Sequence, residues 1–245
     1  MSNYKYPTPQ LLLKAICNAI RAKTGSNDKI AHQDIPDELN NIVLKDYYEE
    51  QIENISSIYT GTNLNFSISN NDIKSIARYK FYGSGLTIID LPECTSIGEH
   101  AFDSCKSLIT VNLPKCTSIG TYAFGRCTSL TTVKLPKCTS IVDSAFLGCT
   151  SLATVNLPEC TNINGYAFEI CTNLTTVILS NNQVATLKNI RAFNNSAIAN
   201  GTGYIYVPDN LVDSYKSDTN WSTYANQIKP LSELPSNLKE EYGYD

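Results

Sequence analysis

The sequence lacks an excess of positive charge and any long apolar stretch. Nineteen Lys and Arg residues against 23 Asp and Glu give the 245-residue chain a net charge of −4, so no basic patch typical of nucleic-acid binding is indicated. No run of about 18 apolar residues occurs, and we therefore expect no membrane insertion. Only 17% of the residues are charged, so uncharged polar side chains must form much of the surface.

Histidine is scarce, and the motifs of common enzyme classes are missing. His32 and His100 lie far apart and have no recognisable partner motif, whereas a catalytic triad needs nucleophile, base and orienter within mutual reach. The sequence contains no G-x-S-x-G, no P-loop, no G-x-G-x-x-G and no H-E-x-x-H pattern. We therefore expect no catalytic activity and no cofactor.

Cysteine, by contrast, is abundant and regularly spaced. The chain has nine cysteines, and the closest pair in the regular series is eleven residues apart, unlike the C-x₂₋₄-C knuckles of zinc sites. We favour a buried ladder of thiols that act as small apolar side chains, with disulfides and a metal site as the alternatives. The series is Cys94, Cys105, Cys116, Cys127, Cys138, Cys149, Cys160 and Cys171.

The cysteine spacing reflects an internal repeat of 22 residues. Four units begin at Leu86, Leu108, Leu130 and Leu152, and a fifth opens at Leu174. Within a unit, Leu-x-x-Val-x-Leu places positions 4 and 6 on one face of a strand, and the proline at position 7 ends that strand. Ile at position 12 and Ala-Phe at positions 16 and 17 are expected to turn inward. One unit cannot bury these residues alone, so the units should stack with their strands parallel.

This pattern resembles the BspA-like (Treponema-type) leucine-rich repeat, which joins an L-x-x-L-x-L-P strand to an I-G-x-x-A-F-x-x-C turn. The resemblance implies an α/β repeat fold, a leucine-rich-repeat solenoid with parallel β-strands, and it implies adhesion, because known members are exported adhesins. Val142 and Asn164 depart from the glycine of the first two units. In the first unit the matching residues are Leu91-Pro92, Ile97-Gly98, Ala101-Phe102 and Cys105, with counterparts 22, 44 and 66 residues later.

Chemically different ends flank the repeats, and we expect three parts. Residues 1–50 form an N-terminal helical hairpin, residues 51–208 the solenoid with atypical terminal repeats, and residues 209–245 a helical cap and tail. Thr8-Pro9 begins the first helix as cap and first position. The segment 19–25, followed by Lys29-Ile30, resembles an N-terminal module of tail-associated proteins from phages and prophages of Gram-positive bacteria, which implies attachment.

The C-terminal part is expected to close the open end of the solenoid. Residues 205–208 are typical of a last strand, after which Asp209 should cap a helix. Trp221, Tyr224 and Ile228 follow at roughly helical spacing, while residues 232–245 show little apolar periodicity and are expected to form a mobile tail. Thirteen of the 15 tyrosines lie outside residues 86–173, so the flanks offer a second candidate contact surface.

The candidate binding surface is the outward face of the main strands. Position 3 carries threonine, position 5 carries polar residues and position 8 carries charged ones, which suits contact with a protein or a glycan. A competing interpretation is that threonine columns are simply favourable strand surface. The candidates are Thr110, Thr132, Thr154 and Thr176 at position 3, Asp90, Asn112, Lys134 and Asn156 at position 5, and Glu93, Lys115, Lys137 and Glu159 at position 8; Ile88 and Ile178 fall in the same columns.

The sequence therefore predicts a non-catalytic binding or attachment solenoid that recognises a protein or glycan surface, of phage or prophage origin. One alternative is a scaffolding component that docks through the helical hairpin, and another is a bacterial surface adhesin whose export signal has been trimmed. No signal peptide is visible, because the start is polar and the Leu11–Leu13 run is broken at Lys14. We expect cytoplasmic synthesis and association with a virion, with the cell surface as the alternative; unpaired cysteines agree with a reducing compartment.

Overall fold

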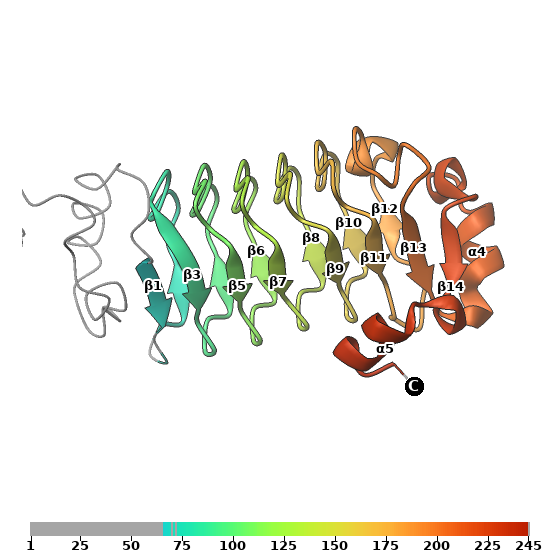
Figure 1. Ribbon diagram of the computed structural model, residues 1–245, viewed down its shortest axis with the longest axis horizontal. Coiled ribbons are helices and arrows are strands. Elements are labelled where there is room, and N and C mark those ends of the chain that lie inside the picture. The colour runs from blue at the N-terminus through green and yellow to red at the C-terminus, as the bar shows by residue number, and fades with distance from the viewer. Residues whose placement is uncertain (1–65, 70, 72, 245) are drawn as a thin grey trace, which may run out of the picture.

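The computed structural model describes residues 66–69, 71 and 73–244. The predicted helical hairpin of residues 1–50 and the ninth cysteine, Cys17, lie outside the described residues. In the described part, successive units stand side by side along the long axis, each with one strand in a main sheet (Figure 1). A second strand of each unit lies in a smaller sheet, which we call the back sheet.

Both sheets are entirely parallel. The back sheet consists of two-residue strands, β2 (Ser75–Ile76), β4 (Ser96–Ile97), β6 (Ser118–Ile119), β8 (Ser140–Ile141), β10 (Asn162–Ile163) and β12 (Thr186–Leu187). The main sheet contains, in order, β1 (Phe66–Ser69), β3 (Leu86–Asp90), β5 (Thr110–Asn112), β7 (Thr132–Lys134), β9 (Thr154–Asn156), β11 (Thr176–Ile178), β13 (Tyr204–Val207) and β14 (Ile228–Pro230).

The register of the main sheet follows the 22-residue repeat. Val111 pairs with Val133, and Val155 pairs with Val177, so the same position of each unit stands beside its counterpart. This register aligns the inward residues into continuous columns. The predicted stacking of parallel units is confirmed.

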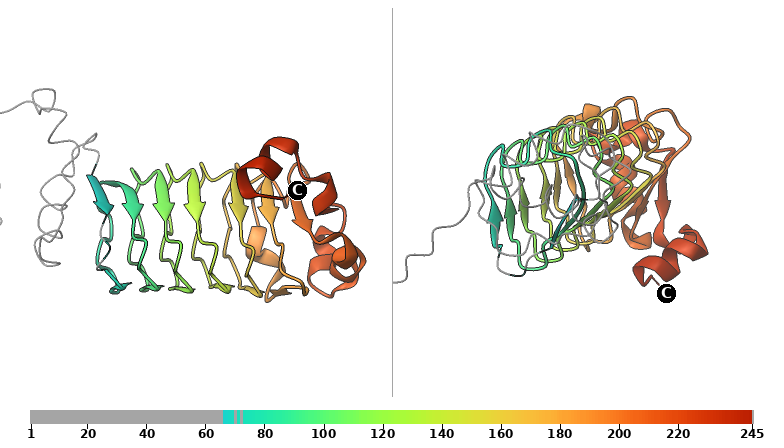
Figure 2. Two further views of the ribbon diagram at one scale, coloured as in Figure 1. Left: turned by 90° about the horizontal axis from the view of Figure 1, so that it is seen from below. Right: turned by 60° about the vertical axis from the view of Figure 1, so that its left-hand side comes forward.

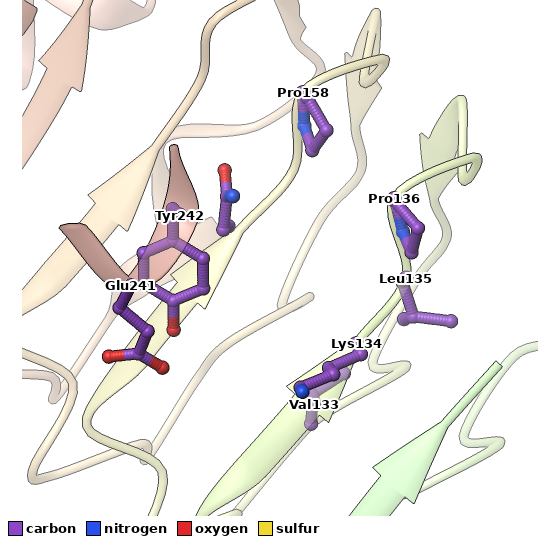
Figure 3. Close-up of a pocket in the computed structure, with 8 residues that line it drawn as sticks. Val133, Lys134, Leu135, Pro136, Pro158, Glu241 and Tyr242 are labelled. Atoms are coloured by element: carbon purple, nitrogen blue, oxygen red, sulfur yellow. The ribbon is translucent and has the colours of Figure 1, made fainter. Parts of the chain in front are cut away.

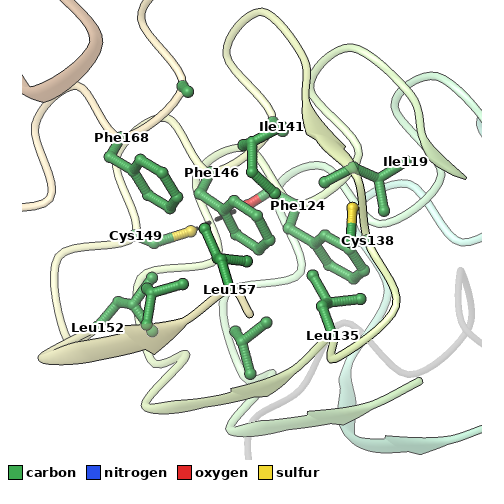
Figure 4. Packing of buried hydrophobic residues seen from close by; sticks show 14 of the residues in the cluster. Ile119, Phe124, Leu135, Cys138, Ile141, Phe146, Cys149, Leu152, Leu157 and Phe168 are labelled. Atoms are coloured by element: carbon green, nitrogen blue, oxygen red, sulfur yellow. Dashed lines mark hydrogen bonds between the residues drawn. The ribbon is translucent and has the colours of Figure 1, made fainter. Parts of the chain in front are cut away.

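A ladder of phenylalanine rings runs through the core (Figure 4). Six rings stack with centroids 5.3–5.6 Å apart and planes within 7° of parallel, as offset aromatic pairs prefer. The last of them, Phe193, contacts Trp221 and Tyr224 of the C-terminal cap. The ladder comprises Phe81, Phe102, Phe124, Phe146, Phe168 and Phe193.

Eight cysteines form two buried columns of free thiols. In one column each thiol donates to the carbonyl oxygen of a phenylalanine one unit earlier, as Cys149 does to Phe124 at 3.1 Å (Figure 4). In the other, each thiol donates to the carbonyl two residues further on, as Cys138 does to Ser140 at 3.3 Å. The thiols therefore pack as apolar groups and also satisfy backbone acceptors, which confirms the buried-thiol interpretation for these eight.

The C-terminal cap covers the last repeat but differs from the prediction. Its helices are the 3-10 helix η3 (Asp209–Leu211), α4 (Val212–Ser217) and the 3-10 helix η4 (Trp221–Tyr224). The buried Trp221 donates its indole N–H to the carbonyl of Ala185 at 2.6 Å. The hydroxyl of Tyr215 accepts a hydrogen bond from the backbone N–H of Ala185. This cap closes the hydrophobic core as expected.

Three local predictions in the cap were wrong. Residues 205–208 are not the last strand, because β14 pairs with β13, and Ile228 belongs to that strand rather than to a helix. Asp209 does not cap a helix, since its carboxylate accepts from the backbone N–H of Ser232 at 3.0 Å. The spacing of three and four residues between Trp221, Tyr224 and Ile228 therefore fits a single helical turn followed by a strand as well as it fits one helix.

The expectation of a tail over residues 232–245 was also wrong. The 3-10 helix η5 (Leu231–Glu233) and α5 (Ser236–Tyr242) fold back onto the main sheet (Figures 1 and 2). Leu234 is buried against Ile178 and Tyr206, with four partly buried side chains packed around them. These four are Leu231, Leu238, Tyr242 and Tyr244.

Candidate binding face

The columns at positions 3 and 5 lie on the outside of the main sheet, and the column at position 8 lies in the turns that directly follow the strands. We call these three columns together the outer face. Paired strands place Thr110 beside Thr132, and Thr154 beside Thr176, all of them half-buried. At position 5, Lys134 is exposed and stands between the half-buried Asn112 and Asn156. The strands thus display polar side chains in rows on rigid backbone.

Most charges of the outer face are paired with a neighbour in the next unit. Glu93 accepts from Lys115 at 2.6 Å and from Lys74 at 3.3 Å, which lowers the pKa of its carboxyl. Lys137 pairs with Glu159 in the same way. Asn112 donates to the carboxylate of Asp90 at 2.7 Å. Exposed pairs of this kind stabilise little, but they leave the face without a strong field of either sign.

Lys134 differs from the other charged side chains of the face. In the part of the chain that the structure describes, its ammonium has no ion-pair partner. It lies at the edge of the region occupied by the C-terminal segment, residues 231–244.

The C-terminal segment covers one end of the outer face. Ile178, expected to point into solvent, is fully buried beneath it. The hydroxyl of Tyr244 lies 2.8 Å from the hydroxyl of Ser180 and donates to the Asn156 amide oxygen at 2.9 Å. Burial of Ile178 removes an apolar side chain from water, and this explains why the segment docks there.

A cavity of about 240 Å³ lies where α5 meets the outer face (Figure 3). Lys134 and Asn156 contribute from β7 and β9, and Glu241 and Tyr242 contribute from α5. Burial, followed by the neighbouring Glu241 carboxylate, raises the pKa of Tyr242 to about 12, so its hydroxyl stays protonated at neutral pH. The remaining lining residues are apolar, namely Val133, Leu135, Pro136 and Pro158.

Sequence reasoning missed the residues of the C-terminal segment that complete this cavity. The signal present was the tyrosine excess outside the repeats, because Tyr242 and Tyr244 both contact the outer face. The particular contacts were not readable, since Asn156 and Tyr244 are 88 residues apart.

His100 belongs to a second cluster, at the turns of the first units. Its ring is stacked between Tyr79 and Tyr122, with centroids 4.7 and 4.8 Å away. Its Nδ1 lies 2.8 Å from the buried carboxylate of Asp103, which also accepts from Arg126.

This cluster does not form a triad. The Nε2 of His100 lies 3.6 Å from the carboxylate of Glu99, and the nearby Ser104 hydroxyl donates to Asp103 rather than to the imidazole. A nucleophile positioned by the base is therefore missing, and the contacts orient the aromatic stack.

The thiols of Cys116, Cys138 and Cys160 are poorly suited to bind a metal or act as nucleophiles, because both tasks need the thiolate. Burial raises the pKa of Cys116 and Cys160 to about 12 and that of Cys138 to about 11. Among the residues described, no three His, Cys, Asp or Glu side chains gather as a metal site would require. Nor does any helix there have the length and apolar character to cross a membrane.

Parallel strands repeated every 22 residues, with inward leucine columns and a second short strand in each unit, define a leucine-rich-repeat solenoid. The chain belongs to the family described as the BspA type leucine rich repeat region, whose model matches residues 50–175 and 95–211 in six copies. Repeats of this family are typically non-catalytic.

Two solved structures are similar to the chain. One is a leucine rich cell surface protein from Faecalibacterium prausnitzii, 22% identical with a TM-score of 0.37, and the match covers 71% of this chain and 37% of that protein. The other is a leucine rich repeat protein from T. pallidum, 26% identical with a TM-score of 0.45, covering 64% of this chain and 83% of that one. The chain thus spans little more than a third of the Faecalibacterium protein. The comparison with curated proteins found no match.

Proposed function

We propose that the protein is a non-catalytic binding solenoid that recognises another protein through the open part of the outer face, over β3, β5 and β7. The observation that carries this proposal is the set of polar columns on these strands, which no described segment covers at β3 and β5 and which α5 only borders at β7. Stacked repeats commonly provide extended binding surfaces of this kind.

The chemistry of the open face fits a polar protein surface better than a highly charged partner. Its acidic and basic side chains neutralise each other along the sheet, whereas Thr110 and Thr132 offer hydroxyls. Exposed Ile88, at the same position on β3, adds an apolar contact. A role in attachment to a cell or virion rests on resemblances alone, namely that of the repeats to exported adhesins and that of residues 19–25 to phage modules.

Site-directed photo-crosslinking tests the proposal. Benzoylphenylalanine is placed at Thr132 on the outer face and, as a matched control, at the exposed Thr139 near the back sheet. Each protein is irradiated with surface proteins of the organism that encodes the chain. We expect one discrete crosslinked product from position 132 and none from position 139. Equal products from both positions, or none from position 132, would contradict a binding role for this face.

A further inference from the structure

The cavity between α5 and the outer face is partly open to solvent and is lined by parts of the chain that are distant in sequence. Lys134 and Asn156 belong to the neighbouring strands β7 and β9. Glu241 and Tyr242 belong to the C-terminal helix α5 and face Lys134 across the cavity (Figure 3). Lys134 and Asn156 are equivalent positions of successive units, but α5 packs over only one end of the outer face. The described residues therefore hold a site that the repeat pattern alone would not provide.

We propose that this cavity binds one neutral sugar ring. The proposal rests on the proposed function in that both use the outer face, and it adds a ligand class and a site. At about 240 Å³, the cavity is smaller than the roughly 300–1,000 Å³ typical of sites for drug-sized molecules, so a single ring is the appropriate size.

The charges of the lining favour a neutral ligand. Lys134 would repel a cationic ligand, and Glu241 would repel an anionic one. A side chain that meets a ligand of its own charge loses contact with water and gains no partner in exchange. A ligand with many hydroxyl groups satisfies both, because each hydroxyl can donate to the carboxylate or accept from the ammonium.

The rest of the lining matches the faces of a sugar ring. Pro136 and Pro158 supply apolar surface for the C–H groups of a pyranose. The hydroxyl of Tyr242, which is protonated and interacts with the Glu241 carboxylate, adds a further polar group to the lining. A pyranose combines hydroxyl groups with apolar C–H faces, and the lining likewise combines polar side chains with apolar ones.

Two polar residues of the site, Asn156 and Tyr242, are held in place before any ligand binds. The amide oxygen of Asn156 is occupied by the hydroxyl of Tyr244 at 2.9 Å, which leaves its two N–H groups as donors. Tyr242 and Leu238 pack against Ile178, Tyr206 and Leu234, and this anchors α5 on the sheet. Preorganisation of this kind reduces the ordering cost of binding.

Ligand-observed NMR titration of the full chain tests the proposal. The probes are the methyl glycosides of glucose, galactose, mannose and N-acetylglucosamine, with the zwitterion glycine and the anion acetate as probes that carry charged groups. We expect saturable binding of at least one glycoside and none of the charged probes. Lys134→Met and Glu241→Gln should each weaken that binding by about tenfold, since each removes a charge-assisted hydrogen bond.

Two matched variants control for nonspecific effects. Lys188→Met removes an exposed lysine directly after β12 of the back sheet, and Glu240→Gln changes an exposed acid on the same helix as Glu241; neither residue lines the cavity. Both should bind as the wild type does. Failure of every glycoside to saturate, equal binding by all four variants, or binding of the charged probes in place of glycosides would overturn the proposal.

The titration and the crosslinking experiment together distinguish failure of the sugar site from failure of the proposed protein-binding function. Loss of glycoside binding together with intact crosslinking from position 132 would remove only the sugar site. Glycoside binding that depends on Lys134 and Glu241, without any crosslink from position 132, would instead uphold the sugar site and remove only the protein-binding role.

Discussion

Phe124 shows how much a single core residue contributes to the solenoid. It is fully buried between Phe102 and Phe146, each with its ring centroid 5.4 Å away. Phe124→Ala would leave a hole with an unstacked ring on either side. We expect the free energy of unfolding in urea to fall by roughly 3–5 kcal/mol, whereas Ile109→Ala at an exposed site should change it by less than about 0.5 kcal/mol. A loss below about 1 kcal/mol for Phe124→Ala would be inconsistent with a packed ladder.

Ile170 is a residue whose backbone conformation is unfavourable for its side chain. Each turn places two residues in the left-handed region, and Ile170 has φ 60° while its counterpart Gly148 has φ 70°. A β-branched residue is strained there, whereas Asn and Gly tolerate the conformation.

Ile170→Asn should therefore stabilise the protein. Ile170 is exposed, so the substitution sacrifices little packing, and we expect a gain of about 1 kcal/mol in the free energy of unfolding. Ile109→Asn is the matched control, because Ile109 is also exposed but is not among the left-handed residues. Urea titration of both variants measures the difference, and a gain of the same size in the control would rule out relief of backbone strain as its cause.

The strands could be predicted from the sequence because every unit repeats the same pattern of apolar residues. Leu113, Leu135 and Leu157 stand 22 residues apart and are all buried, so a misreading of one unit would have conflicted with the others. The same period placed the twelve candidate residues on one face, although their role in binding stays a prediction.

The C-terminal segment could not be read in the same way. It occurs once, and its apolar residues at 231, 234, 238 and 242 recur every three or four positions only over three turns. Their partners, Ile178 and Tyr206, lie in the solenoid. The local spacing therefore indicates the helix but not the surface on which the helix docks. The residues that α5 contributes to the proposed sugar site could not be predicted for the same reason.

Docking of the C-terminal segment should be separable from folding of the repeats. Leu238→Asp places a charge in the contact with Ile178 and Tyr206, which should cost the docked state about 2 kcal/mol. We expect amide hydrogen exchange within residues 231–244 to accelerate by about thirtyfold, while exchange in β5, β7 and β9 is unchanged. Asn237→Asp adds the same charge at an exposed neighbour and should have no such effect. Uniform acceleration across the strands would show that the segment is part of the cooperative solenoid.

On the scale of the whole molecule, the stack buries thiols that must stay neutral. The pKa of Cys116 is raised from 9.0 to about 12, chiefly by burial, and that of Cys138 to about 11. Between pH 9 and pH 11 the unfolded chain loses these protons while the folded chain keeps them. The unfolded state then binds fewer protons, so stability is complete below pH 9 and falls as pH rises towards the folded-state values.

Cys116→Ala should flatten this alkaline loss of stability. A buried thiol whose pKa is raised as far as that of Cys116 contributes a slope of about 1.4 kcal/mol per pH unit between pH 9 and pH 11, and the variant lacks this thiol. The packing lost on truncation lowers stability at every pH alike, so the difference in slope isolates the titration of Cys116. Urea titrations of both proteins at pH 7.5, 9, 10 and 11, in reducing agent, measure the slopes. Identical slopes would mean that Cys116 ionises as readily in the folded chain as in the unfolded one, and burial of the thiol column would then not be the source of the pH dependence.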